Sequence, residues 1–138
     1  MNPLLELKKA ALRGVDVKVI IPSKIDILLV KWASLTFYKE MMASGIHIYE
    51  FGPNMLHAKT IIIDDWALVG SSNLNHRSFM HDLELDAVLQ TEKAKNKLHE
   101  LFKEDLLHCQ AIEMSHLKRR SWLDKLLSYF AMAVRYWL

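Results

Sequence analysis

The chain has 138 residues, 51% of them hydrophobic and 25% charged, which is enough for one globular domain with a sizeable core. Its formal net charge of +2 is too small to indicate nucleic-acid binding by itself. The single cysteine, Cys109, excludes an internal disulfide and suits a small core position. No segment reaches the roughly 18 uninterrupted apolar residues that a spanning helix needs, and the first residues lack the basic start and apolar run of a signal peptide.

Helices and strands are predicted to alternate along the first 114 residues. Asn2 and Pro3 form a typical helix start, Gly14 is placed to end that helix, and Thr91 is a suitable N-cap for a later one. The predicted helices span residues 3–14, 27–43 and 91–108, and the predicted strands span residues 15–21, 46–51, 60–63, 66–69 and 82–90. This alternation predicts an α/β fold in which a mixed sheet of about five strands is flanked by helices.

Residues 57–73 concentrate side chains suited to phosphate chemistry. His57 and Lys59 are two residues apart, so on a strand both side chains point to the same side of the sheet. The β-branched run that follows and its return predict a hairpin around a tight Asp64-Asp65 turn, which brings residues 70–73 (Gly-Ser-Ser-Asn) back towards His57. The imidazole offers a nucleophile, the ammonium offers a cation, and the serine and asparagine side chains can hold phosphate oxygens.

This stretch resembles the HKD motif of the phospholipase D superfamily, in which H-x-K is followed after four residues by D and after six more by G-S-x-N. His57, Lys59 and Asp64 fit that spacing, but only five residues separate Asp64 from Gly70, which indicates a hairpin turn shortened by one residue. The resemblance covers about residues 3–114 and is greatest to the C-terminal half of bacterial cardiolipin synthases. It implies one half of a phospholipase D-like fold, since the chain contains no second HKD motif.

The resemblance implies catalytic roles for the motif residues. His57 would attack phosphorus, and Lys59 would neutralise charge on the non-bridging phosphate oxygens. Ser71 and Asn73 would bind phosphate and supply oriented hydrogen bonds in the transition state. The family's motif aspartate falls at Asp64, whose position also suits a turn residue that accepts backbone N–H bonds, and both roles stay open.

Glu84 is the candidate for the group that orients His57. The resemblance puts the histidine-orienting glutamate at this offset, and a nucleophilic imidazole needs a partner on its other nitrogen. The alternative role is a solvated strand position. His76 and His81 with Asp82 are candidate metal ligands, but no recognisable zinc spacing accompanies them, so we expect neither a metal nor another cofactor.

The last 24 residues differ in composition from the rest of the chain. Residues 115–138 contain five Lys and Arg side chains and one Asp, interleaved with leucines and aromatic residues such as Trp122 and Trp137. Such a segment suits the plane of an anionic bilayer surface, with aromatic rings at headgroup depth. The alternative is a final helix packed on the domain. We therefore divide the chain into a phospholipase D-like domain, residues 1–114, and an amphipathic helical tail, residues 115–138.

The resemblance implies phosphatidyl transfer through a phosphohistidine, as in the conversion of phosphatidylglycerol to cardiolipin. The expected partners are anionic phospholipid, the cytoplasmic side of a bacterial cell membrane, and a second HKD half. That half would belong to the same longer protein or to a second copy in a homodimer. Two alternatives stay open, namely a single-motif nuclease that acts as a homodimer and an inactive fragment that binds lipid. Nucleic acid is not the expected partner, because the positive charge lies in the tail rather than around the motif.

Overall fold

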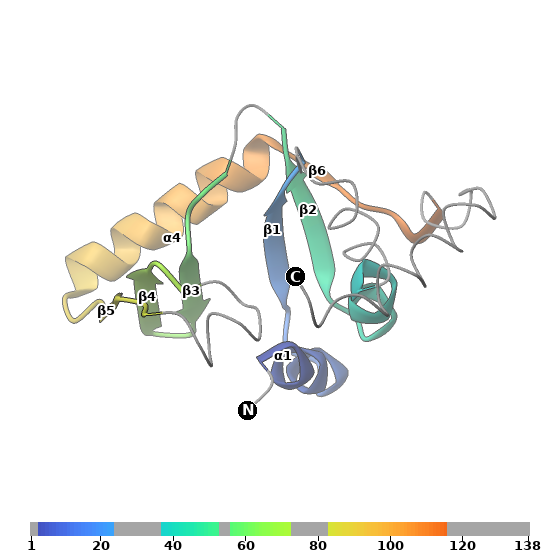
Figure 1. Ribbon diagram of the computed structural model, residues 1–138, viewed down its shortest axis with the longest axis horizontal. Helices are drawn as coiled ribbons and strands as arrows, with labels where there is room; N and C mark the ends of the chain where they lie inside the picture. Colours follow the sequence, from blue (N-terminus) through green and yellow to red (C-terminus); the bar gives the residue numbers. More distant parts are fainter. Residues whose placement is uncertain (1–2, 24–36, 53–55, 73–82, 116–138) are drawn as a thin grey trace.

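The computed structural model describes residues 3–23, 37–52, 56–72 and 83–115 (Figure 1). These residues form a mixed α/β arrangement, as predicted. Its helices are α1 (Pro3–Leu12), a helical segment at 37–43 and α4 (Glu92–Leu107). Its strands are β1 (Lys18–Pro22), β2 (His47–Phe51), β3 (Thr60–Ile63), β4 (Trp66–Gly70), β5 (Asp86–Val88) and β6 (Cys109–Ala111).

The described strands form two sheets of three strands each, ordered β1-β2-β6 and β3-β4-β5. β1 and β2 are parallel, whereas β2 and β6, β3 and β4, and β4 and β5 are antiparallel. The predicted single sheet of about five strands is therefore not confirmed within this part of the chain. One extra strand, β6, was not predicted because Cys109-Gln110-Ala111 has no β-branched residue and is recognisable only by its pairing with β2.

The fifth predicted strand is much shorter than residues 82–90. Within the described part of this range, residues 83–90, the strand spans only Asp86–Val88, opposite residues 68–70 of β4, with one further backbone hydrogen bond on each side. Beyond it, the N–H of Leu85 donates to the side-chain Oγ of Ser71 at 2.9 Å rather than to a backbone carbonyl. A serine hydroxyl that takes a place in the ladder ends the regular strand, which sequence alternation alone cannot reveal.

The core lies between the β1-β2-β6 sheet and the helices that cover it. Its buried residues are Val17, Tyr38, Met41, Ile46 and Ile48, the last only 1% exposed, and apolar residues of α1 pack against them. α4 contacts β2, β6 and β4, so it bridges the two sheets and lies behind the strands in Figure 1.

The predicted ends of the helices are confirmed where the structure describes them; residues 27–36 of the predicted helix 27–43 lie outside the described residues. Gly14 and Gly45 adopt a φ of +92°, the left-handed conformation that ends a helix at low cost for glycine. The side chain of Thr91 caps α4 by accepting the N–H of Ala94 at 3.3 Å.

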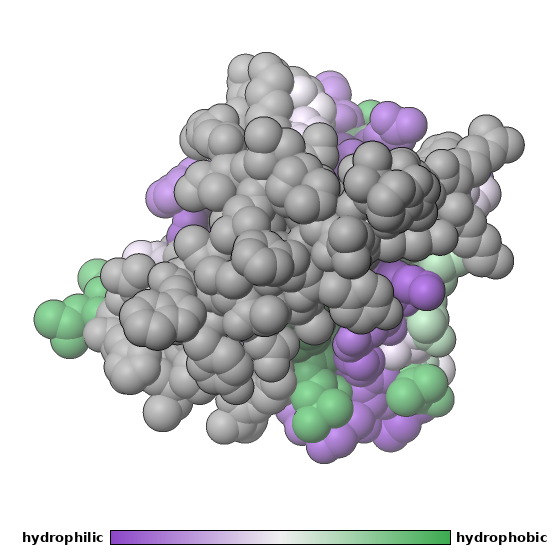
Figure 2. Space-filling model, turned by 45° about the vertical axis from the view of Figure 1, so that its right-hand side comes forward, coloured by the Kyte–Doolittle hydropathy of each residue, from purple (hydrophilic) through white to green (hydrophobic). Residues whose placement is uncertain are grey.

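Several large apolar side chains stay exposed, among them Leu83, Leu85 and Leu107. On the face drawn in Figure 2, hydrophobic residues appear as separate green patches among hydrophilic ones. None of the helices in the described ranges is both long enough and apolar enough to span a membrane. The predicted tail, except for Ser115, lies outside the described residues, so the proposed domain boundary stays a prediction.

Candidate active site

The β3–β4 hairpin has the predicted form. Ile63 pairs with Trp66, which leaves Asp64 and Asp65 as a two-residue turn. Asp64 has a φ of +50°, as a two-residue turn of the favoured hairpin type requires, and aspartate tolerates this conformation better than most residues. The segment between Asp64 and Gly70 is one residue shorter than in the superfamily motif because the turn is tight, and the pairing of the two strands is intact.

This pairing brings the two parts of the motif together. The N–H of Gly70 donates to the carbonyl of Lys59 at 3.0 Å, so the ladder continues one residue beyond β3. His57 itself is exposed and lies in the non-strand segment 56–59 before β3, so the strand geometry that would point His57 and Lys59 to the same side of a sheet does not apply there. The Nζ of Lys59 donates to the His57 carbonyl at 3.1 Å, which holds the H-x-K segment in a compact form.

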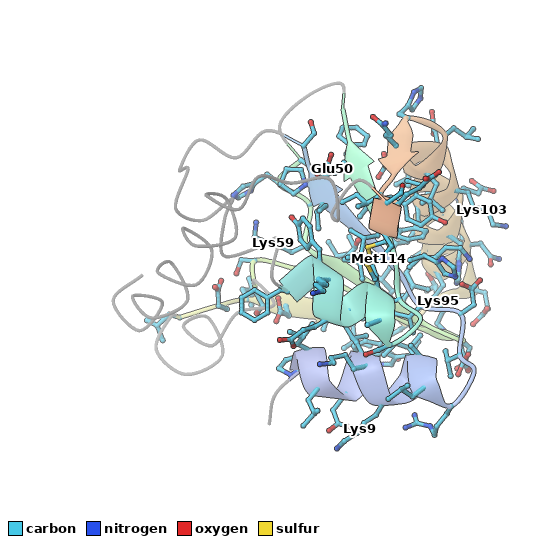
Figure 3. All side chains as sticks on the ribbon, turned by 90° about the vertical axis from the view of Figure 1, so that its right-hand side faces the viewer. Lys9, Glu50, Lys59, Lys95, Lys103 and Met114 are labelled. Carbon is cyan, nitrogen blue, oxygen red and sulfur yellow. The ribbon has the colours of Figure 1, made fainter. Side chains whose placement is uncertain are left out.

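Lys59 lies away from α4, the helix that bridges the two sheets. In Figure 3 it lies on the opposite side of the strands from α4, whose Lys95 and Lys103 are labelled. A phosphate that approaches Lys59 therefore does not meet α4.

Ser71 connects the loop after β4 with the chain before β5. Its N–H donates to the Leu85 carbonyl at 3.0 Å, and its Oγ accepts the Leu85 N–H at 2.9 Å and donates to Glu84 Oε2 at 2.5 Å. A serine hydroxyl has one hydrogen, so this donor is directed to Glu84. Sequence reasoning chose both residues but missed their contact, since they are 13 positions apart and no spacing rule connects them.

Asp86 is a residue at the site that sequence reasoning did not select. Its Oδ1 accepts the N–H of Ser72 at 3.2 Å, and its Oδ2 accepts the Ser72 hydroxyl. These hydrogen bonds, the hydroxyl first, lower the pKa of Asp86 below its ordinary value. The alternation of Asp82, Glu84 and Asp86 along the sequence was the available signal, because it puts three carboxylates on one side of a strand.

Gly70 lies very close to the strand that pairs with β4. An added Cβ would lie 1.7 Å from Asp86 Oδ1 and 2.8 Å from Asp86 Cα. The glycine therefore makes room for the neighbouring strand and its carboxylate.

Neither Asp64 nor the candidate metal ligands are seen beside Lys59 and the Gly-Ser loop in the part of the chain that the structure describes. Asp64 is five residues beyond Lys59, at the far end of the hairpin, roughly 16 Å away along an extended strand. Asn73, the remaining motif residue, and the candidate metal ligands His76, His81 and Asp82 lie outside the described residues. Across the ranges that the structure describes, no three His, Cys, Asp or Glu side chains are grouped as a metal site.

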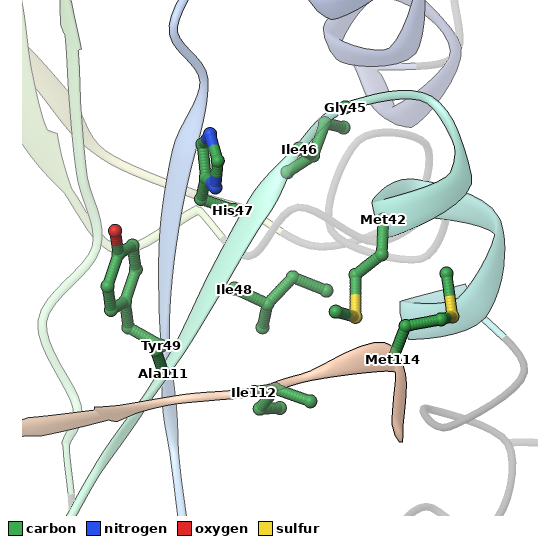
Figure 4. A pocket seen from close by; sticks show the side chains of 9 residues that line it. All are labelled: Met42, Gly45, Ile46, His47, Ile48, Tyr49, Ala111, Ile112 and Met114. Carbon is green, nitrogen blue, oxygen red and sulfur yellow. The ribbon is translucent and has the colours of Figure 1, made fainter. Parts of the chain in front are cut away.

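The pocket in Figure 4 lies on the other sheet. It has a volume of about 180 Å³ and is lined mainly by apolar side chains of residues 42–49 and 111–114. None of the motif residues lines it, so it is not the candidate active site.

The fold, the compact H-x-K segment and the Gly-Ser loop beside it define a phospholipase D-like domain. The chain belongs to that family, since the family model described as "Cardiolipin synthase, PLD-like domain" matches residues 2–106. The predicted resemblance to the phospholipase D superfamily is confirmed by this match.

Curated relatives carry the name of one enzyme. The chain is 35% identical to "Cardiolipin synthase" of Halalkalibacterium halodurans over 122 residues, which are 88% of this chain and 24% of that protein. It is 38% identical to "Cardiolipin synthase 2" of Bacillus cereus over 115 residues, 83% of this chain and 22% of that protein. It is 36% identical to "Cardiolipin synthase A" of Buchnera aphidicola over 119 residues, 86% of this chain and 24% of that protein.

The chain thus spans about a quarter of the length of these relatives. No solved structure matches it significantly.

Proposed function

We propose that the chain supplies one HKD half of a phosphatidyl-transfer site of the cardiolipin synthase type. The names of its relatives support the reaction class. The observation that carries the proposal is the hydrogen bond from the Gly70 N–H to the Lys59 carbonyl, because it sets the H-x-K segment beside the Gly-Ser loop. A phosphodiester bound at that corner meets a nucleophile and a cation beside a polar loop.

The reaction consists of two displacements at one phosphorus. In the first, an imidazole nitrogen of His57 attacks phosphorus, the bond to the departing alcohol breaks, and a histidine of the second HKD motif protonates that alcohol. In the second, an acceptor hydroxyl attacks, the second histidine takes its proton, and the phosphorus–nitrogen bond to His57 breaks. With phosphatidylglycerol as donor and acceptor, the products are glycerol and cardiolipin.

The remaining motif residues assist these displacements. Lys59 balances the charge on the non-bridging oxygens, and Asn73 adds a hydrogen bond to phosphate. Glu84 orients the His57 ring and is itself held by Ser71, whose hydroxyl donates to Glu84 Oε2. Because that hydroxyl has one hydrogen, Ser71 must release Glu84 before it can donate to phosphate.

A second HKD motif completes the site. Each displacement needs an acid or base besides His57, and one such motif is present in this chain. The relatives are about four times as long as the matched segment, which favours a second motif in the same longer polypeptide. A twofold pair of this chain, with two copies of His57 facing each other, is the other arrangement.

The substrate also determines where the protein works. A phosphatidyl donor sits in a bilayer, so the site must approach the membrane surface. The basic, Trp-bearing residues 115–138 suit peripheral binding to anionic lipid on the cytoplasmic side of a bacterial membrane.

The test is lipid analysis after incubation with vesicles of phosphatidylglycerol. The chain is supplied alone or together with an N-terminal half taken from a relative, and His57→Ala is compared with the wild type. We expect cardiolipin and glycerol from the completed wild-type site, and a loss of at least about 10³-fold in His57→Ala. His108→Ala, which changes an exposed histidine at the end of α4, is the matched control and should retain activity.

Two results would contradict the proposal. Undiminished transfer by His57→Ala would exclude His57 as the nucleophile. The second result is that the wild-type chain alone cleaves DNA, that His57→Ala does not, and that no transfer product forms from phosphatidylglycerol. This result would replace the proposed reaction with that of a homodimeric nuclease.

A further inference from the structure

Asp86 and Gly70 face each other across the β4–β5 pair. Gly70 is the register partner of Asp86, and directly opposite residues of antiparallel strands point to the same side of the sheet. Gly70 has no side chain, so the Asp86 carboxylate occupies the volume that a Cβ would fill, 1.7 Å from Oδ1. The carboxylate can therefore lean across β4 towards the residues that follow it.

The group that it reaches is Ser72. Asp86 Oδ1 accepts the Ser72 N–H at 3.2 Å, and Oδ2 accepts the Ser72 hydroxyl, so both donors of this residue are used by one carboxylate. One residue earlier, the N–H of Ser71 donates to the Leu85 carbonyl at 3.0 Å. The chain that leaves β4 is thus tied to the β5 side at two successive residues.

The chemistry of these bonds favours an ionised aspartate. A carboxylate that accepts two hydrogen bonds is stabilised in its charged form, and the pKa of Asp86 is lowered accordingly. At neutral pH, Asp86 is a permanent anion at the base of the loop. Both donors of Ser72 then bind the Asp86 carboxylate, which ties Ser72 to β5.

We infer that Asp86 is a positioning residue of the phosphate-binding loop, which holds residues 70–72 in the conformation that presents the loop to a phosphodiester. Asp86 itself does not contact the phosphate, since two anions at one point would repel each other. The inference rests on the proposed function for the identity of the bound group. The way in which the loop is held rests on the contacts of Gly70, Ser72 and Asp86 alone.

The experiment uses the purified chain, inorganic phosphate as the probe, and NMR spectra of backbone amides. In Asp86→Ala we expect the Ser72 amide to exchange with solvent at least about tenfold faster, because its acceptor is gone. We also expect the affinity for phosphate to fall on the order of tenfold. The Gly70 amide, which donates to Lys59, is the internal control and should exchange at the wild-type rate.

Two further variants separate positioning from general damage. Asp86→Asn keeps an oxygen that accepts the Ser72 N–H, so it should restore most of the slow Ser72 exchange and of the phosphate affinity. Asp16→Asn changes an aspartate just before β1 of the other sheet, which pairs with Lys18, and should alter neither quantity.

The outcomes distinguish this inference from the proposed function. A wild-type chain whose amides do not respond to phosphate contradicts the proposed function, while the exchange rate of Ser72 still tests the anchoring. Equal Ser72 exchange in Asp86→Ala and wild type overturns the inference. Unchanged or tighter phosphate binding in Asp86→Ala also overturns it, because a tighter complex would mean that the carboxylate competes with phosphate for Ser72.

Discussion

The Ser71 hydroxyl donates to Glu84 Oε2 at 2.5 Å, across 13 positions of sequence. The bond joins a residue expected to hold phosphate to the residue expected to orient His57. The two residues therefore act as one unit, and a change at either one alters the other.

The first prediction is that Ser71→Ala and Glu84→Gln are not additive. If Ser71 acts by holding Glu84, the second substitution adds little once the first has been made. We expect a coupling energy of roughly 1 kcal/mol in the transfer activity of the completed site, measured by a double-mutant cycle. Ser115→Ala with Glu113→Gln, a serine–glutamate pair far along the chain, is the matched control for the cycle and should leave activity unchanged. Additive losses at residues 71 and 84 would mean that Ser71 acts on phosphate directly.

The second prediction concerns Asp64, for which a catalytic role and a turn role were equally open. Its φ of +50° and its place at the far end of the hairpin favour the turn role. Asp64→Gly and Asp64→Asn, which suit this conformation, should keep transfer activity within about twofold and keep the melting temperature close to that of the wild type. Asp64→Val should lower the free energy of unfolding by about 1–2 kcal/mol, measured by denaturant titration. A large loss of activity in a stably folded Asp64→Asn protein would restore the catalytic role.

The elements that sequence analysis predicted well are those with strong local signals. The hairpin follows from a β-branched run and two aspartates, and α4 follows from an N-cap threonine and an amphipathic pattern. The helix end at Gly14 follows from the low cost of a left-handed glycine.

The parts that were missed depend on contacts between distant segments. β6 exists only because Cys109-Gln110-Ala111 meets β2, and the division into two sheets depends on which strands pair rather than on where strands form. In the same way, the motif spacing identified Ser71 and Glu84, but Asp86 becomes visible only when Gly70 is seen opposite it. Side-chain contacts across a sheet depend on register, which local pattern does not determine at this loop.

The third prediction is a pH dependence at Asp86. The hydrogen bonds from Ser72 lower the folded-state pKa of Asp86. The hold of the Asp86 carboxylate on Ser72 is therefore fully present above the ordinary pKa of 3.8 and is lost as the pH falls through the folded-state pKa. An NMR titration of the Asp86 carboxyl should give a midpoint below 3.8 in the wild type. Ser72→Ala removes the hydroxyl whose hydrogen bond does most to lower the pKa of Asp86, so the midpoint should rise towards 3.8. A wild-type midpoint at or above 3.8 would mean that Ser72 does not hold the carboxylate in solution.

The fourth prediction uses Cys109 as a reporter for the strand that was not predicted. Cys109 pairs with Phe51 in the β2–β6 register, its thiol donates to the Asp105 carbonyl at 3.1 Å, and burial, assisted by the charge of Asp105, raises its pKa above the ordinary 9.0. Because the thiolate is the reactive form, alkylation by iodoacetamide at pH 8 should be slower in the folded chain than in denaturant, by on the order of tenfold. Substituting the strand partner, Phe51→Ala, should weaken the pairing of β6 and speed the reaction, whereas Leu5→Ala on α1 should not. Equal alkylation rates in the folded and denatured chain would mean that β6 does not pair with β2 in solution.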